Sequence, residues 1–563
     1  MKKRIFLIGA CILSFTMLSC DKEVLDLNST KEISDLAIWS TERAAEMYVT
    51  ASYKGITDVS QVVNSRNEYY DSYSDIMKST SWDLYNHAYN KTLLEANIQT
   101  GSAGPFECWD DAYGRIRRAN VLLVDIDRYG VAKFGEEWCN VRRAEARFCR
   151  AFSYYRLIRV YGGVPIRTDK SGVNGGVDDG ANPENINRAR ATEAESWDFV
   201  IKELQWATTY LPDAWPPEWE GRATKKAAYG LISRMALFGQ QWEVAAKAAE
   251  KVKELGGDLA PDYAKVFQVD GGQDNSKEIL FALSFLKNEI THPYDQRNRP
   301  VGDKAVYGVD IWGEHVPTAE LADLYEFSDG TPFNWATYAT AGHADPYTDR
   351  EPRFHATILY NGAQWENRTI QTYVGGTDGF VAFAKAGATN AHTCTGYYLR
   401  KYLQEGHTDF ISGSYQYDAV LRYAEVLLNK AEAYAQWDYA QYRQQALDAL
   451  NEVRHRVNLP LKTAADAPNL DAFMTLLRKE RCVELAGEGF RYWDLRRWKL
   501  AANVINGKMA HGVKITNTSG VLSYETVNCD ANTSRIFLER FYYFSLPTSE
   551  TVNNKLCDNN PLW

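Results

Sequence analysis

The stretch that decides the fold is residues 141–165, VRRAEARFCRAFSYYRLIRVYGGVP. Its small and apolar residues recur every three or four positions, the spacing of one face of an α-helix. Gly162, Gly163 and Pro165 predict the end of that helix. Five arginines fall mostly off the face and are expected to stay solvated. The face itself consists of Val141, Ala144, Phe148, Ala151, Tyr155 and Ile158, and the arginines are Arg142, Arg143, Arg147, Arg150 and Arg156.

Other stretches carry the same pattern and need a partner helix as well. Paired helices of about 34 residues with Ala or Gly and aromatic residues at the packing positions are typical of tetratricopeptide-like repeats. The chain is therefore predicted to be mainly helical, with antiparallel helix pairs. The predicted helices cover residues 41–56, 106–127, 192–211, 222–239, 242–255, 418–437, 442–457, 470–486 and 490–500.

Between residues 258 and 414 helical periodicity is sparse, and Gly, Pro, Asn, Asp and Thr are dense. Short apolar runs at residues 276–285, 356–360 and 397–403 predict strands or extended loops. Residues 59–105 are similarly polar and aromatic, and long loops of this kind often carry function.

The N-terminus reads as a targeting segment and not as part of the fold. Lys2, Lys3 and Arg4 precede an apolar run at residues 5–18 that is short for a membrane span. The run ends at Ser19-Cys20, which looks like a bacterial lipoprotein cleavage site. We expect residues 1–19 to be a signal peptide and Cys20 to carry the lipid. The alternative is an ordinary secretory signal followed by an incidental cysteine.

Composition narrows the function classes. The net charge of −10 argues against nucleic acid as a partner. None of the nine cysteines is spaced as C-x-x-C, so no zinc or thioredoxin motif is visible. The 16 Trp and 35 Tyr residues could form an aromatic core or a surface that stacks on a flat ligand such as a sugar ring.

An ordered set of segments resembles the SusD/RagB family of outer-membrane nutrient-binding lipoproteins of the Bacteroidetes. The segments run in family order along the whole chain, starting with the signal that ends at Cys20. The others are AYGRIRRANVLL (112–123), the opening stretch, ATKKAAYGLISRMALF (223–238), RYAEVLLNKAEAYAQ with ALDALNEVRHRVNLP (422–436 and 446–460), LRKERCVELAGEGFRYWDLRRW (477–498) and YYFSLPTSE with NNPLW (542–550 and 559–563).

The resemblance implies a mainly α fold with four tetratricopeptide-like helix pairs as scaffold. It also implies an irregular, loop-rich ligand-binding half with short strands. Residues 20–256 would form the N-terminal helical region and residues 257–563 the C-terminal region of one integrated body. A glycan ligand, a lipid anchor in the outer membrane facing the cell exterior, and a SusC-like TonB-dependent transporter as partner are implied as well. The family offers no catalytic residues to transfer, and no cofactor or metal is expected.

Sugar recognition needs flat aromatic side chains for the apolar face and polar side chains for the hydroxyl rim. Two loop segments offer this mixture, around residues 79–90 and 292–315, with a weaker third at residues 365–373. The predicted aromatic platform is Trp82, Tyr85, Tyr294 and Trp312. The predicted polar contacts are Asp83, Asn86, Asp295, Arg297 and Arg368.

Charged residues of the segment 477–498 are interpreted as structural, because alternating signs at spacings of three and four can pair along and between helices. They are Glu480, Arg481, Glu484, Glu488, Arg491, Asp494 and Arg497.

Three other functions stay open on residues alone. The same fold could capture peptides or glycopeptides, using charge or backbone edges in place of an exposed Trp platform. It could be an assembly scaffold without a small ligand, in which case Trp82 and Trp312 would be buried or at a protein interface. A glycosidase needs only two carboxylates at the right separation, which sequence cannot measure.

Overall fold

The computed structural model describes residues 35–59, 69–81, 89–168, 187–269, 277–385 and 392–563. The chain forms two compact units, residues 1–48 and 49–563. In the first unit, α1 (Asp35–Ile38) precedes the start of α2 (Glu42–Thr50). The Thr41 hydroxyl accepts the Ala44 N–H at 3.2 Å and caps this helix, and the Trp39 ring lies edge-on to Tyr48.

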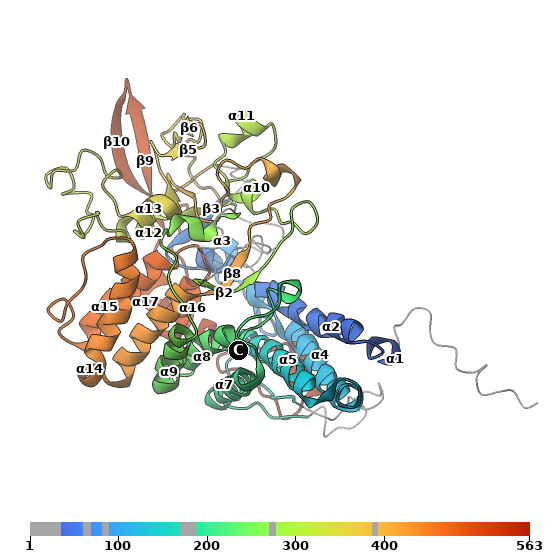
Figure 1. The fold of residues 1–563 in the computed structure, drawn as a ribbon. Helices are drawn as coiled ribbons and strands as arrows, with labels where there is room; N and C mark the ends of the chain where they lie inside the picture. The colour runs from blue at the N-terminus through green and yellow to red at the C-terminus, as the bar shows by residue number, and fades with distance from the viewer. Residues whose placement is uncertain (1–34, 60–68, 82–88, 169–186, 270–276, 386–391) are drawn as a thin grey trace, which may run out of the picture. The chain divides into compact units, whose positions relative to one another are not determined.

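Successive helices of the second unit pack against one another to form the helical scaffold (Figure 1). The pairs α4 with α5 and α7 with α8 are as the sequence predicts, and α9 with α14 and α14 with α15 pack together as well. The bounds are α4 (Trp109–Asp125), α5 (Val131–Tyr161), α7 (Glu193–Tyr210), α8 (Lys225–Phe238), α9 (Trp242–Glu254), α14 (Tyr423–Arg456), α15 (Leu470–Glu484) and α16 (Arg491–Arg497).

Helix α5 ends as the sequence predicts, but three of the five arginines expected to stay solvated, Arg142, Arg150 and Arg156, are buried. Gly162 adopts φ +74°, which glycine tolerates without a steric penalty, and its N–H returns to the Ile158 carbonyl at 2.8 Å. Arg150 is only 3% exposed and bonds Glu203 of α7, while Arg156 is 4% exposed and bonds Asp111 of α4. The prediction of a wet arginine face is wrong because α5 lies between α4 and α7, so a second face is covered too.

The segment at residues 418–437 is also not one helix. Its first five residues form strand β8 (Asp418–Arg422), which pairs antiparallel with β2 (Ile279–Leu283). Helix α14 begins only at Tyr423 and is interrupted at Asp438, whose φ of −160° and ψ of 99° are not helical. A short apolar run such as DAVLR has no periodicity that separates a buried strand from a buried helix.

Short strands and one-turn or two-turn helices make up the loop-rich half. The strands pair antiparallel in twos, β1 with β3, β4 with β7, β5 with β6, and β9 with β10. Their bounds are β1 (Met77–Ser79), β3 (His315–Pro317), β4 (Ile358–Leu359), β5 (Gln364–Trp365), β6 (Arg368–Thr369), β7 (Tyr398–Leu399), β9 (His511–Thr518) and β10 (Val521–Asn528). The chain's short helices are α3 (Tyr89–Glu95), α10 (Tyr294–Asn298), α11 (Asp303–Tyr307), α12 (Ala319–Leu324), α13 (Pro352–Thr357), α17 (Ala501–Ile505) and α18 (Thr548–Asn553). Of these, α17 packs in the scaffold cluster through Ala501 and Ile505.

The apolar core separates into two clusters that follow this division. One cluster is built mainly from the helical scaffold and includes Phe148, Leu231 and Leu450. The other lies in the loop-rich half and includes Phe354 and Trp365. The predicted mainly α fold, with helix pairs as scaffold and a loop-rich half with short strands, is confirmed. The boundary at residues 256 and 257 stays a prediction.

Cysteines do not organise the fold of the described residues. The seven cysteines in this part of the chain are all free thiols and all buried. Cys139, Cys149 and Cys482 lie buried in helices, where they pack as small hydrophobic residues.

A network of buried ion pairs joins α15 to the loop-rich half. Arg422, at the end of β8, contacts Glu484 of α15 at 2.7 Å and Glu488 at 2.6 Å. Lys401 contacts Glu488 at 2.6 Å, and Arg353 of α13 contacts Glu484 at 3.1 Å. None of these side chains is more than 1% exposed. Burial would raise the pKa of Glu484, but the surrounding guanidinium groups hold it well below its ordinary value.

Other charged residues of this segment pair in the same manner. Arg481 and Arg497 both contact Asp494, at 2.6 and 2.8 Å, and Glu480 contacts Arg454 at 2.8 Å. The interpretation of this charge pattern as structural is therefore confirmed for these residues.

Replacement of Glu484 by Gln should destabilise the fold strongly, because several guanidinium groups would then lack a buried counter-charge. The expected loss in unfolding free energy is about 3–5 kcal/mol, measured by urea denaturation. The matched control is Glu243→Gln, which breaks an exposed pair with Lys247 on α9 and should cost less than about 1 kcal/mol. Equal losses for the two variants would contradict the structural role.

Candidate ligand-binding surface

Helices α10 and α11 and the segment that follows them form one layer on the loop-rich half. α11 ends at Gly308, which has φ +69° and returns its N–H to the Lys304 carbonyl at 2.9 Å. The chain then turns back along α10. The Trp312 N–H donates to the Gln296 carbonyl at 3.1 Å, and the Gln296 side chain donates to the Asp310 carbonyl at 3.1 Å. This turn places Trp312 beside α10.

Trp312 is partly exposed and is supported from within the protein. The Arg297 guanidinium lies 5.4 Å from the centroid of its ring, an arrangement that favours a cation–π interaction. Arg297 is itself only 4% exposed and contacts Glu314 at 3.2 Å. Arg297 thus holds the indole in place from behind and does not reach solvent, so its predicted role as a polar ligand contact is wrong for this structure.

Tyr294 and Asp295 are core residues, contrary to the prediction that they contact the ligand. Both are 0% exposed. The Tyr294 hydroxyl donates to the Lys401 carbonyl at 3.1 Å. The Asp295 carboxylate accepts hydrogen bonds from Ser414 at 2.9 Å and Gln416 at 2.7 Å. Their side chains fix α10 to the body of the protein.

Arg368 is also occupied by protein groups. Its guanidinium contacts Asp303 at 2.6 Å and Asp378 at 2.7 Å, and both carboxylates are buried. Burial acts to lower the pKa of Arg368, but the two carboxylates raise it above its ordinary value. The prediction that Arg368 binds ligand directly is therefore not supported by its geometry, and Arg368 anchors the β5–β6 hairpin to α11.

Arg299 supports the outer end of the same layer. It is fully buried and contacts Asp303 at 2.9 Å and Glu366 at 2.8 Å. Its guanidinium also lies 5.4 Å from the Tyr307 ring and 4.3 Å from the Phe410 ring, and these two rings meet edge to face at 5.0 Å. Tyr307 is partly exposed, so a second aromatic side chain lies in this layer near Trp312.

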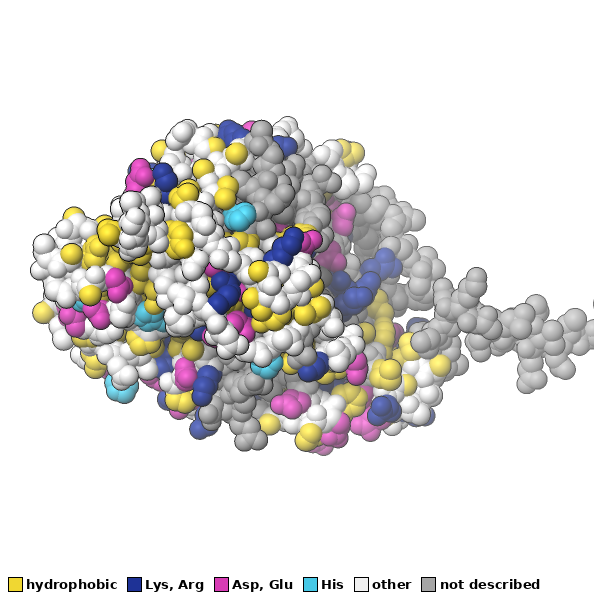
Figure 2. All heavy atoms as spheres, turned by 90° about the horizontal axis from the view of Figure 1, so that it is seen from above, with side chains coloured by type: hydrophobic (Ala, Val, Ile, Leu, Met, Phe, Trp, Pro, Cys, Tyr) yellow, Lys and Arg dark blue, Asp and Glu magenta, His cyan; other side chains and the backbone are white. Residues whose placement is uncertain are grey.

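Exposed apolar side chains extend the layer. Val306 is 61% exposed and Ile411 is 51% exposed. Seen from above, this face carries hydrophobic side chains interspersed with charged ones (Figure 2). Nothing in the sequence distinguishes Val306 or Ile411, because single apolar residues in polar loops give no signal that separates a surface position from a core position.

Four predicted ligand contacts cannot be compared with this geometry. Trp82, Asp83, Tyr85 and Asn86 lie outside the described residues. The same holds for the predicted lipidation site, Cys20. Within the described ranges, no cluster of three His, Cys, Asp or Glu side chains could hold a metal ion. No helix among these same residues is both long and apolar enough to cross a membrane.

The structure is a helical-repeat scaffold that carries a loop-built layer with partly exposed aromatic side chains. The chain belongs to the SusD family, because the model of that family matches residues 277–563. Residues 23–237 match a related family described as starch-binding and associating with the outer membrane.

Solved structures and curated relatives agree with this membership. A SusD-like protein from Bacteroides fragilis shares 27% identity with a TM-score of 0.78, covering 95% of this chain and 99% of that one. A SusD-like carbohydrate-binding protein from the same species shares 26% identity with a TM-score of 0.74, covering 92% and 99%. SusD-like protein P2 of Formosa agariphila is 26% identical, covering 80% of this chain and 79% of the relative.

The attachment of α10 should weaken in acid through His292, which is 3% exposed. Its Nε2 donates to the Gln416 carbonyl at 3.0 Å, and its Nδ1 accepts the Tyr294 N–H at 3.4 Å. Both nitrogens are thus used by the neutral ring, and burial lowers the pKa of His292 from 6.5 to about 4. Between these values the unfolded chain binds more protons than the folded chain, so stability falls as the pH falls.

We expect wild-type protein to lose up to about 3 kcal/mol more unfolding free energy than His292→Gln between pH 7 and pH 4. Urea denaturation at a series of pH values measures both. The two pH profiles would run parallel if His292 did not contribute.

Proposed function

We propose that this chain is a cell-surface lipoprotein that captures an oligosaccharide or polysaccharide and delivers it to a SusC-like TonB-dependent transporter. It acts by binding and not by catalysis. Membership of the SusD family supports this function. So does the likeness to a carbohydrate-binding protein of the same fold at 26% identity.

The observation that carries the proposal is the partly exposed ring of Trp312, fixed from behind by Arg297. A sugar ring presents an apolar C–H face that packs on such an aromatic side chain. Asp310 and Lys304 are exposed nearby and form an ion pair at 2.7 Å, so they can bind hydroxyl groups at the rim. Because the indole is held before the ligand arrives, little ordering of this side chain opposes binding.

The partial exposure of Trp312 also favours glycan binding over the two alternatives, an assembly scaffold and peptide capture. An assembly scaffold without a small ligand predicts that this ring is buried or at a protein interface. Peptide capture needs charged groups or open backbone edges more than an aromatic platform. Trp82, Asp83, Tyr85 and Asn86 remain part of the proposed site as sequence-based predictions, since they belong to the other loop segment rich in aromatic and polar residues.

Replacement of Trp312 by Ala should weaken glycan binding about tenfold, because an aromatic stacking surface contributes on the order of 1–2 kcal/mol. The measurement is retardation of detergent-solubilised full-length protein in native gels that contain a panel of polysaccharides. Trp437→Ala, at a partly buried tryptophan of α14, is the matched control. A glycan that retards wild type and Trp312→Ala equally would move the binding site away from this surface.

Replacement of Cys20 by Ser should remove the lipid and release the protein from the membrane fraction. A single acyl chain binds membranes only reversibly, whereas several chains on one residue anchor a protein stably. Membrane fractionation and the intact mass of the protein test this. If Cys20→Ser stays in the membrane fraction with unchanged mass, Cys20 is not the attachment site.

A further inference from the structure

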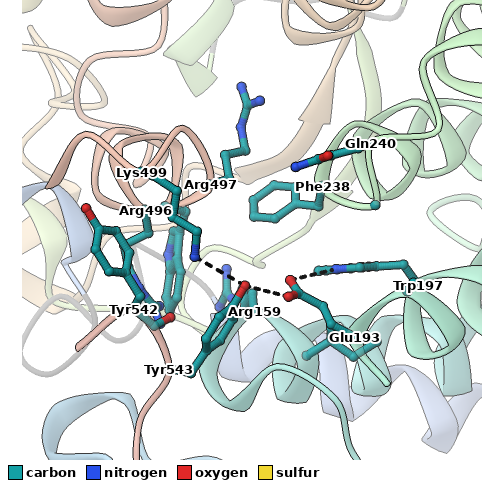
Figure 3. Close-up of a pocket in the computed structure, with 14 residues that line it drawn as sticks. Arg159, Glu193, Trp197, Phe238, Gln240, Arg496, Arg497, Lys499, Tyr542 and Tyr543 are labelled. Carbon is teal, nitrogen blue, oxygen red and sulfur yellow. Dashed lines mark hydrogen bonds between the residues drawn. The ribbon is translucent and has the colours of Figure 1, made fainter. Parts of the chain in front are cut away.

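A cavity of about 270 Å³ lies in the helical scaffold, apart from the Trp312 layer. It forms where the end of α5, the start of α7, the end of α8 and helix α16 converge with the C-terminal segment (Figure 3). Its polar and aromatic lining includes Arg159, Glu193, Trp493, Arg496, Lys499 and Tyr543.

Two features of the backbone shape this cavity. Gln240 and Lys499 both line it and both adopt φ +55°, a conformation that non-glycine residues rarely take. Gly239 also lines the cavity and packs against Trp197, because a Cβ at this position would come within 2.9 Å of the Trp197 side chain. Strained residues of this kind are retained where the surrounding structure fixes them, often around binding sites.

Several buried donors on the lining residues have no acceptor among the described residues. They are Nε and Nη1 of Arg496, Nε1 of Trp493 and Nε of Arg159. Arg496 is 4% exposed and Trp493 is 3% exposed. Arginine and tryptophan side chains can only donate hydrogen bonds, and an unpaired buried donor costs about 1–3 kcal/mol. These atoms are covered by protein, so the fold leaves unpaired donors and uncompensated positive charge behind the cavity wall.

The lining residues of the cavity carry a net positive charge once those that form ion pairs within the protein are left out of the count. Arg497 points away from Glu193 and Tyr543 (Figure 3) and is neutralised by Glu432 and Asp494. Three cations remain, Arg159, Arg496 and Lys499, against Glu193 in the lining and the exposed Glu539 near Lys499.

Glu193 is already engaged within the protein. It accepts hydrogen bonds from the Tyr543 hydroxyl at 2.6 Å and from Trp197 Nε1 at 3.3 Å, while Lys499 Nζ lies 3.5 Å from the same Tyr543 hydroxyl (Figure 3). Burial lowers the pKa of Arg496, which means that the acidic groups nearby do not fully replace its lost hydration. An anion in the cavity would supply the missing charge.

We propose that this cavity binds a small carboxylate-bearing sugar of one ring, with the carboxylate toward Lys499, Arg159 and Arg496. Glu193 and Gln240 are placed to bind ring hydroxyls, and Phe238 offers an apolar surface. The volume lies just below the range of about 300–1,000 Å³ that is usual for ligand pockets, so a longer chain does not fit inside. The choice of a sugar as ligand rests on the proposed function, although the two sites share no residue.

The test is isothermal titration calorimetry of detergent-solubilised full-length protein with glucuronate, glucose and acetate. Glucuronate should bind saturably and at least tenfold more tightly than either glucose or acetate. Lys499→Gln should weaken glucuronate binding at least tenfold, and Lys499→Arg should restore most of it. Lys247→Gln, which removes an exposed charge on α9, is the matched control and should leave binding unchanged.

Three outcomes would overturn the proposal. Absence of heat with glucuronate would show that the cavity is not such a site. Equal affinity for glucose would remove the role of the charge, and equal affinity for acetate would remove the role of the sugar ring. Full glucuronate binding by Lys499→Gln would place the anion elsewhere. Lys499 is exposed, so its substitution does not disturb the core, and unchanged thermal unfolding confirms this for each variant.

Discussion

The structure depends on the buried ion pairs around Glu484. This carboxylate connects α15 to Arg422 at the end of β8 and to Arg353 of α13. Buried ion pairs therefore join the scaffold to the loop-rich half. Such a network adds little net stability over an apolar core of the same volume, but the loss of one member leaves its partners uncompensated. The pairs therefore join the two halves through charged groups, each of which requires its partner.

The Trp312 layer repeats this principle on a smaller scale. Its exposed aromatic side chains lie over buried ions, with Arg297 and Glu314 behind Trp312 and Arg299 behind Tyr307. The short helices α10 and α11 are too brief to be stable alone. Regular secondary structure does not hold this surface in position. The ion pairs and hydrogen bonds of α10 and α11 to the body of the protein do. A loop-built surface can thus be nearly as rigid as one built on a helix.

The sequence predicted the helical scaffold well because its signal is periodic. The face of α5 and its end at Gly162 follow from spacing and from the conformational freedom of glycine. Spacing could not reveal that α5 is covered on two sides, which buries Arg150. In loops no periodicity exists, so Tyr294 and Trp312 looked alike in composition, and only the turn at Gly308 leaves one of them partly exposed while the other is in the core.

The arginine pair at the end of α16 shows what separates a structural charge from a functional one. Arg496 and Arg497 are neighbours in one segment, and nothing in the sequence distinguishes them. Arg497 meets two carboxylates, whereas Arg496 meets backbone carbonyls and aromatic rings and keeps donors without acceptors. A buried charge that the fold fully pairs serves the fold. A buried charge that is left incompletely paired beside a cavity makes that cavity electropositive, so the completeness of pairing identifies candidate sites in an arginine-rich protein.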